Sequence, residues 1–289
     1  MGTVRLPPRR EEALASFKKG DCIITFAVAS LFTGEPNERL RTNVLCLLGT
    51  HIHYTRGMHN LCIGVRTMRV ANLTAQAFYE DEGKILSAVY FQGCNKDCKW
   101  CHNPELKPMG GGIEKTPEEI FSEITKGNFL SDGVLLSGGE PTIQKGIVEL
   151  CCHFVGIGWR VVLNTNGSMP GVVDNLPEGM KVTLDVKTPK KDYGMDSGTI
   201  DFCIQALQRF NESEIRITWS PSYLTEVNVI EMVRWIRSIN KESPIYLQPY
   251  KWTTKMPGVP FIQPNKEQVA ALIKRVQEST GHLMKTRYV

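Results

Sequence analysis

The 289-residue sequence contains no apolar run long enough to cross a lipid bilayer. Its longest run, from Ile23 to Phe32, is far shorter than the ~20 residues that a transmembrane helix needs. The opening stretch RLPPRREE also lacks the basic and apolar regions of a secretory signal peptide. These absences predict a cytoplasmic protein with no membrane partner.

The sequence also lacks a dense stripe of Lys and Arg. Its formal net charge is only +4, from 34 basic and 30 acidic side chains. Nucleic-acid-binding domains usually concentrate basic residues on one face. The composition therefore gives no reason to expect a nucleic acid partner.

A closed disulfide framework is not expected either, because the nine cysteines are an odd number. Three of them, Cys94, Cys98 and Cys101, fall within eight residues. In a cytosolic chain, clustered cysteines more often bind metal or take part in catalysis than form disulfides. This cluster is therefore the first candidate for a functional site.

From about residue 86 onward, apolar strand-like segments alternate with helical patterns. The expected strands are Leu86–Phe91, Gly133–Leu136, Arg160–Leu163, Val182–Val186, Ile215–Trp219 and Ile245–Leu247. The expected helices are Pro117–Lys126 after a Thr116 cap, Ile143–Val155, Ile200–Phe210, Val227–Ile239, and Lys266–Ser279 after Asn265. Such alternation predicts an α/β fold with a parallel sheet. Six strands are too few for an eight-stranded barrel, so we expect a partial (β/α)6 barrel.

Residues 1–68 do not follow this alternation. We interpret them as an N-terminal extension of unknown role, and residues 69–289 as the core domain. The extension contains Cys46, His51, His53, His59 and Cys62. Their spacing matches no metal-binding pattern, so we do not expect a second metal site there.

The cysteine cluster has the spacing C-x3-C-x2-C and directly follows the first expected strand. Three thiolates on one loop can hold three irons of a [4Fe-4S] cubane, leaving the fourth iron open to a small molecule. The alternative is zinc, which usually has four protein ligands in structural sites. His102 would be the fourth ligand, but a residue adjacent to Cys101 is poorly placed to bind the same ion.

This spacing, with Trp100 before the last cysteine, resembles the radical S-adenosylmethionine (SAM) superfamily. The run from Phe91 to Leu106, which ends in CHNPEL from Cys101 onward, is similar to the activating-enzyme branch. That branch includes the activases of pyruvate formate-lyase and of anaerobic ribonucleotide reductase. The resemblance extends from about residue 70 to the C-terminus. It implies that one electron from the cluster cleaves SAM, whose methionyl group binds the open iron, to a 5′-deoxyadenosyl radical.

The second expected strand ends in Ser137-Gly138-Gly139-Glu140-Pro141. Glycines there allow a ligand to approach the backbone closely, although the segment could also be a plain turn. The resemblance implies that Gly138 and Gly139 meet the methionyl amine of SAM and that Glu140 orders the turn. It also implies that Trp100 lies near the adenine, with simple packing on the barrel as the alternative.

Further candidates end the later strands. Asn164 and Thr165 could hydrogen-bond the cofactor, although the activases more typically have aspartate where Asn164 stands. Asp185 and Lys187 resemble the family's D-x-K pattern, and two residues apart on a strand they face the same way. Lys187 would pair with the methionyl carboxylate and Asp185 would order it; the alternative is a structural salt bridge.

The last two candidates are Arg216 and Gln248. A barrel-facing arginine such as Arg216 needs a partner, and a carboxylate or a ribose would serve. Gln248 stands where some activases place a histidine near the cofactor ribose. We assign no catalytic residue beyond the cluster and SAM.

These features predict an anaerobic oxidoreductase that installs a glycyl radical on a partner of the anaerobic ribonucleotide reductase type. The residues between Cys101 and Gly138 contain no cysteine, which excludes the ferredoxin-like insert of several other activases. A flavodoxin- or ferredoxin-type protein would supply the electron. The alternative is a radical SAM enzyme acting on a small molecule or a nucleic-acid base, as in deazapurine or tRNA-modification chemistry. A non-catalytic iron–sulfur carrier would not need the Gly138–Glu140 turn or the Asp185/Lys187 pair.

Overall fold

The computed structural model describes residues 66–77, 81, 83–127, 131–253 and 261–287. The predictions for the N-terminal extension, including its cysteines and histidines, lie outside these residues. None of the helices in the described part of the chain is long and apolar enough to span a membrane.

The described residues form one nine-stranded sheet in the order β3-β1-β2-β4-β5-β6-β7-β8-β9. The strands are β1 (Met68–Ala77), β2 (Leu86–Phe91), β3 (Ile113–Lys115), β4 (Gly133–Gly138), β5 (Arg160–Thr165), β6 (Lys181–Asp185), β7 (Glu212–Trp219), β8 (Ile245–Pro249) and β9 (Lys285–Thr286). From β2 to β9 every neighbouring pair is parallel. Antiparallel β1 and β3 extend the sheet beyond β2.

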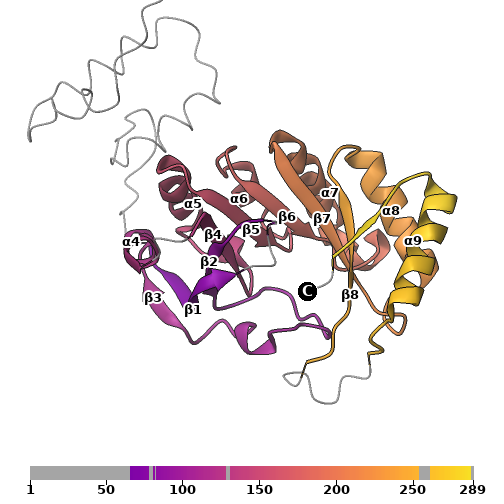
Figure 1. The fold of residues 1–289 in the computed structure, drawn as a ribbon, viewed down its shortest axis with the longest axis horizontal. Helices are drawn as coiled ribbons and strands as arrows, with labels where there is room; N and C mark the ends of the chain where they lie inside the picture. The colour runs from indigo at the N-terminus through magenta and orange to yellow at the C-terminus, as the bar shows by residue number, and fades with distance from the viewer. Residues whose placement is uncertain (1–65, 78–80, 82, 128–130, 254–260, 288–289) are drawn as a thin grey trace, which may run out of the picture. The chain divides into compact units, whose positions relative to one another are not determined.

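Helices connect the parallel strands and follow one another along one side of the curved sheet (Figure 1). They are α4 (Pro117–Gly127), α5 (Ile147–Gly156), α6 (Pro170–Asp174), α7 (Ser197–Ala206), α8 (Glu226–Ile239) and α9 (Lys266–Thr280). This arrangement leaves the other side of the sheet as the inside of a partial barrel, as the alternating pattern predicts.

Strand residues alternate between these two sides. Val134, Leu136, Val161 and Leu163 belong to the large core under the helices, whereas Leu135 belongs to a small apolar cluster on the inner side. Along β6, β7 and β8 the inner positions are polar or aromatic: Lys181, Thr183, Asp185, Glu214, Arg216, Thr218, Tyr246 and Gln248. The inside of the barrel therefore has a small apolar cluster in β2, β4 and β5 and is mostly polar or charged along the later strands.

All six expected strands are present, but three further strands were not predicted. In β1 the pairing register with β2 shifts between Val70 and Asn72, so the apolar alternation changes phase within the strand. The strands β3 and β9 have three and two residues, too few for a pattern. A periodicity argument depends on an unbroken phase over at least four residues.

The predicted helix caps are confirmed at two places. The Thr116 hydroxyl accepts from the Glu119 N–H at 3.2 Å, and Asn265 caps α9 in the same way through Gln268. The expected start of α5 at Ile143 is wrong. Gln144 is extended there because its side chain bonds the backbone of Arg69 and Gln92, so the helix begins only at Ile147.

Two further helices differ from the expectation. The expected helix Ile200–Phe210 begins earlier, as α7, and ends in a 3-10 turn at Leu207–Arg209. The short helix α6 was not predicted, because five residues are too few to show a helical period.

We predict that Gly133→Ala destabilises the fold, because its new Cβ would lie 1.9 Å from the backbone oxygen of Arg160 on β5. Overpacking of this kind costs ~1–3 kcal/mol or more. Gly171→Ala is the matched control, since nothing lies within 4 Å of its new Cβ. Urea denaturation should show a lower midpoint for the first variant and an equal or higher one for the second. Equal midpoints for both variants would contradict this account of β4–β5 packing.

Candidate active site

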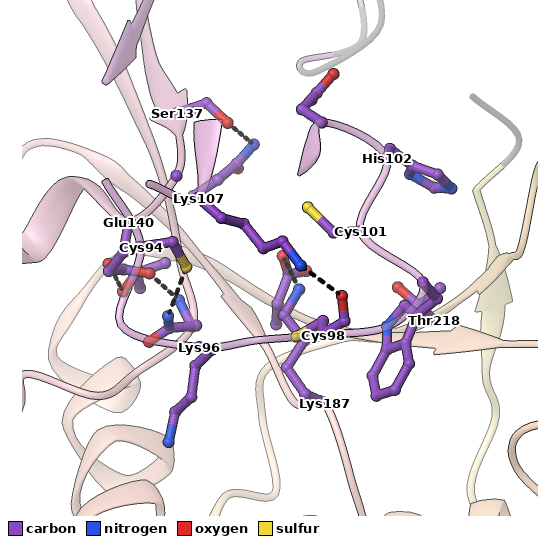
Figure 2. Close-up of a pocket in the computed structure, with 18 of the residues that line it drawn as sticks. Cys94, Lys96, Cys98, Cys101, His102, Lys107, Ser137, Glu140, Lys187 and Thr218 are labelled. Atoms are coloured by element: carbon purple, nitrogen blue, oxygen red, sulfur yellow. Dashed lines mark hydrogen bonds and ion pairs between the residues drawn. The ribbon is translucent and has the colours of Figure 1, made fainter. Parts of the chain in front are cut away.

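A cavity lies at the carboxyl ends of the parallel strands, where α/β sheets bind ligands. Residues from the cysteine loop and from β4, β5, β6, β7 and β8 surround it (Figure 2). Its lining residues include Cys94, Cys98, Trp100, Cys101, Gly138, Gly139, Glu140, Asn164, Thr165, Asp185, Lys187, Arg216 and Gln248. The structure thus brings all thirteen predicted site residues to one place.

Backbone and side-chain hydrogen bonds hold the cysteine loop against the segment that follows it. The N–H groups of Gly93 and Cys94 donate to the carbonyls of Leu106 and Lys107 at 2.8 and 3.0 Å. The buried Gln92 amide donates to the carbonyls of Glu105 and Pro108 at 3.1 and 2.8 Å. Residues 92–108 therefore form a loop that is closed by its own hydrogen bonds.

The three cysteines line the cavity from this loop (Figure 2). All three are partly buried free thiols, and burial raises the pKa of Cys94 and Cys98. Three thiolates on one loop suit a cluster in which each thiolate binds a separate iron.

Gly138 and Gly139 cannot be replaced by larger residues without displacing backbone. Gly138 has φ +114°, and a Cβ there would lie 2.3 Å from the Phe91 nitrogen. A Cβ on Gly139 would lie 2.0 Å from the Gly93 oxygen. The glycines are therefore required first by the close approach of β4 to the start of the cysteine loop, whatever they contact in the cavity.

Glu140 is 1% exposed and accepts four hydrogen bonds. Its Oε1 accepts from the Thr142 N–H and hydroxyl at 3.0 and 2.5 Å and from the Thr165 hydroxyl at 2.7 Å. Its Oε2 accepts from the Asn166 N–H at 2.7 Å. The carboxylate thus orders its own turn, as the sequence predicts, and also joins it to the turn that follows β5.

Asp185 and Lys187 form an ion pair of 2.9 Å on the cavity wall. Burial alone would favour the neutral amine, but the Asp185 carboxylate and the nearby Cys98 raise the pKa of Lys187 above its usual value. The lysine is therefore a fixed positive charge beside the cysteines. The pairing agrees with both readings of the D-x-K pattern, since Asp185 can order a lysine that also contacts a ligand.

Arg216 has its partner within the protein. Its guanidinium contacts the Glu214 carboxylate two residues earlier on β7, at 2.8 Å from Nε and 2.7 Å from Nη2. Lys181 lies 3.1 Å from the same carboxylate, and Arg287 also pairs with it. Although burial opposes ionisation, these three cations lower the pKa of Glu214. Of the two partners expected for Arg216, a carboxylate and a ribose, the carboxylate is present.

The remaining predicted residues are less constrained. The Asn164 amide lies 3.4 Å from the Ser137 hydroxyl, and Gln248 lines the cavity from β8. Trp100 packs on Tyr223, with ring centroids 3.6 Å apart and planes tilted by 37°. Trp100 therefore has both of its predicted roles open to it, because it packs on the barrel and also lines the cavity.

Several site residues were not predicted from the sequence. Asn166 lines the cavity and contacts the cysteine loop, and Glu214 holds Arg216. Lys107 lies beside the loop and pairs with Asp97 at 2.6 Å. Only Glu214 had a signal in the sequence, because residues two apart on a strand share a face. The contacts of Asn166 and Lys107 depend on how the loops fold.

Comparison with known proteins identifies the family. The Radical SAM superfamily model matches residues 89–238, more than half of the 289 residues. The chain therefore belongs to the radical SAM superfamily and is an enzyme that works by radical chemistry. Its cofactors are a [4Fe-4S] cluster and S-adenosylmethionine.

Curated relatives place the chain in the activating-enzyme branch of that superfamily. The pyruvate formate-lyase-activating enzyme of Clostridium pasteurianum is 34% identical over 201 residues, 63% of this chain and 82% of that protein. A glycyl-radical enzyme activating enzyme of Methanocaldococcus jannaschii is 36% identical over 111 residues, 36% of this chain and 44% of that protein. The 7-carboxy-7-deazaguanine synthase of Methanopyrus kandleri is 30% identical over 159 residues, 46% of this chain and 62% of that protein.

Solved structures share the fold. The crystal structure of QueE from Escherichia coli superposes with a TM-score of 0.50 at 15% identity, covering 77% of this chain and 94% of that one. At this identity the likeness concerns the arrangement of strands and helices alone. It agrees with the partial (β/α)6 barrel that the sequence predicts.

We predict that Cys94→Ala, Cys98→Ala and Cys101→Ala each abolish cluster binding, because a cubane held by three thiolates loses one of its few protein ligands. Cys151→Ala is the control, since Cys151 is fully buried in α5 outside the cavity. Iron and sulfide content after anaerobic reconstitution should be about four of each per chain in the control. A full cluster in the Cys98 variant would refute this ligand assignment.

Proposed function

We propose that this enzyme installs a glycyl radical on a partner polypeptide of the anaerobic ribonucleotide reductase type. The observation that carries the proposal is one cavity lined by three cysteines, the Gly138–Glu140 turn and the Asp185–Lys187 pair. The activating enzymes among its relatives support the reaction class. The amino-acid sequence of the cysteine loop and the absence of cysteines between Cys101 and Gly138 favour a reductase partner.

When bound, the cluster and SAM supply a 5′-deoxyadenosyl radical that can take a hydrogen atom from a glycine Cα. The protein must bind and orient these groups and exclude water, because the cofactors carry the difficult chemistry. Cys94, Cys98 and Cys101 would hold three irons. Their shared loop is fixed by the hydrogen bonds of Gln92 and of the Gly93 and Cys94 backbone.

Other cavity residues would hold the methionyl end of SAM. Gly138 and Gly139 would present backbone groups to the methionyl amine, since no side chain shields the turn there. Lys187 would pair with the methionyl carboxylate, with Asp185 keeping the ammonium charged and in place. Asn164 is neutral where the activases more typically have aspartate, so this wall would contribute an amide rather than a charge.

The nucleoside end of SAM would lie toward β7 and β8. Arg216 and Gln248 line that part of the cavity, and the Glu214 carboxylate accepts a hydrogen bond from the Arg216 guanidinium. Trp100 would lie near the adenine, backed by the ring of Tyr223. A flavodoxin- or ferredoxin-type protein would deliver the electron, because the C-x3-C-x2-C motif provides cysteines for one cluster and none for a second cluster that would pass electrons to it.

A second candidate is a small-molecule reaction of the deazapurine type. The 7-carboxy-7-deazaguanine synthase of Methanopyrus kandleri favours it through its 30% identity over 159 residues. The two functions share the cluster and SAM and differ in the substrate. A synthase must turn over many times on a low-mass substrate, whereas an activase reacts about once per partner chain.

We predict that Lys187→Ala weakens SAM binding while the reconstituted protein keeps its iron. Removing a charge-assisted hydrogen bond from a partly buried site costs ~1.5–3 kcal/mol, roughly 10- to 100-fold in affinity. Lys190→Ala is the control, because Lys190 pairs with Asp201 at 2.6 Å and does not line the cavity. Isothermal titration of anaerobic protein with SAM measures both. An unchanged affinity in the Lys187 variant would remove this lysine from the site.

We also predict that mixing the reconstituted enzyme with SAM, dithionite and an anaerobic ribonucleotide reductase produces a protein-centred radical. Electron paramagnetic resonance should show its doublet growing with the release of 5′-deoxyadenosine in about equal amounts. Replacing the reductase glycine that carries the radical by alanine should abolish the signal. Multiple turnovers on a deazapurine precursor, with no radical on any reductase, would instead support the second candidate.

A further inference from the structure

Asn166, in the turn after β5, is a buried polar residue that the proposed reaction leaves unexplained. It is 6% exposed and lines the cavity. Its backbone N–H donates to the Glu140 carboxylate at 2.7 Å, which places its side chain against the cysteine loop. Figure 2 shows Cys94 and Glu140 close together, with dashed lines that mark the interactions around them.

The orientation of the Asn166 amide is determined by its neighbours. Its Oδ1 accepts from the Ser168 backbone N–H at 2.9 Å, and a backbone N–H can only donate. The NH2 group must therefore face the other way, toward Asn95 and Cys94. One N–H donates to the Asn95 Oδ1 at 3.1 Å, and the Cys94 Sγ lies 3.9 Å from the same nitrogen.

The Asn95 side chain reinforces this arrangement. It exchanges two hydrogen bonds with the Ser168 hydroxyl, of 2.8 and 3.1 Å. Asn166 and Ser168 therefore both hold Asn95, the residue that follows Cys94. The distance of 3.9 Å to sulfur is near the outer limit for a hydrogen bond. The geometry nevertheless directs an N–H donor at this thiol, and a thiolate attracts such a donor more strongly than a thiol does.

The surroundings of the other cysteines differ. Cys98 lies near the positive charges of Lys187 and Lys107 as well as the Asp185 carboxylate, whereas Cys94 lies near the Glu140 carboxylate. A negative charge nearby disfavours adding an electron to a cluster. Hydrogen bonds to ligand sulfur atoms have the opposite effect, because they stabilise the more negative reduced state.

We propose that Asn166 is a positioning residue that donates an N–H···S hydrogen bond to Cys94 and thereby raises the reduction potential of the cluster. The inference rests on the proposed role of Cys94 as an iron ligand. It also gives the Glu140 carboxylate a second effect, since the same buried group orders the Gly138–Glu140 turn and holds the Asn166 backbone. The turn proposed to bind methionine and the donor to the cluster are thus parts of one hydrogen-bonded unit.

The test is a redox titration of reconstituted protein, followed by the electron paramagnetic resonance signal of the reduced cluster. Asn166→Ala should keep its four irons and shift the midpoint to more negative values. A tenfold change in the equilibrium constant corresponds to about 59 mV for one electron. Asn166→Asp keeps the acceptor for Ser168 but puts a charged oxygen toward Cys94, so its midpoint should be lower still.

Ser168→Ala is the matched control. It removes the two hydrogen bonds between the Ser168 hydroxyl and Asn95 but keeps the bond from Asn166 to Asn95 and the Ser168 backbone N–H that orients the Asn166 amide. The midpoint should therefore equal that of the unaltered protein. A control shift as large as that of Asn166→Ala would mean that loop packing, not the N–H donor, sets the potential. Unchanged midpoints in both Asn166 variants would overturn the proposal.

A measurement on the unaltered sequence covers the case in which the variants fail to bind iron. Protein labelled with 15N-asparagine should show nitrogen hyperfine coupling to the reduced cluster in pulsed electron paramagnetic resonance. The coupling should persist in Asn95→Ala and also in Asn103→Ala and Asn164→Ala, which replace the other asparagines beside the cavity, so that Asn166 remains as its source. A reduced cluster without any such coupling would contradict the proposal, whereas failure to form a cluster at all would count against the cysteine ligands instead.

Discussion

The buried carboxylate of Glu140 is the interaction on which the site most depends. Burial raises the pKa of this carboxyl group, and four hydrogen-bond donors from two turns act against that shift by favouring the ionised form. Because the donors come from β4 and β5 turns alike, the two strand ends cannot shift independently. The glycine turn, the Asn164–Asn166 turn and the cysteine loop therefore keep one relative geometry.

The alternation of strand residues explains why so much of this site was predictable. Polar side chains at the inner positions of β6, β7 and β8 interrupt otherwise apolar strands, and Arg216 could be recognised in that way, whereas Asp185 and Gln248 were recognised by the resemblance to the activating enzymes. Parallel strands then bring their carboxyl ends to one edge. The family resemblance, together with this topological rule, placed the three cysteines with residues about 150 positions away.

The features that were not predicted depend on contacts between residues that are far apart in the sequence. Such contacts produce no periodic pattern of apolar and polar residues. Asn166 meets the cysteine loop across 71 residues, through Asn95, and Gln144 holds Arg69 across 75. The shift of register in β1 hid that strand for a related reason, since it breaks the phase from which strands are recognised. For Arg216 the sequence predicted the need for a partner, but it left open whether a carboxylate or a ribose would serve, and the structure shows the Glu214 carboxylate.

The contact between Trp100 and Tyr223 has a consequence for how the protein matures. The cysteine loop is made early in synthesis, but Tyr223 and Phe261, which lie around the same tryptophan, follow it by more than 120 residues. During that interval the growing polypeptide carries three closely spaced thiols without the aromatic wall beside them. The aromatic wall beside the cysteines is therefore complete only after the part of the chain that follows β7 has folded.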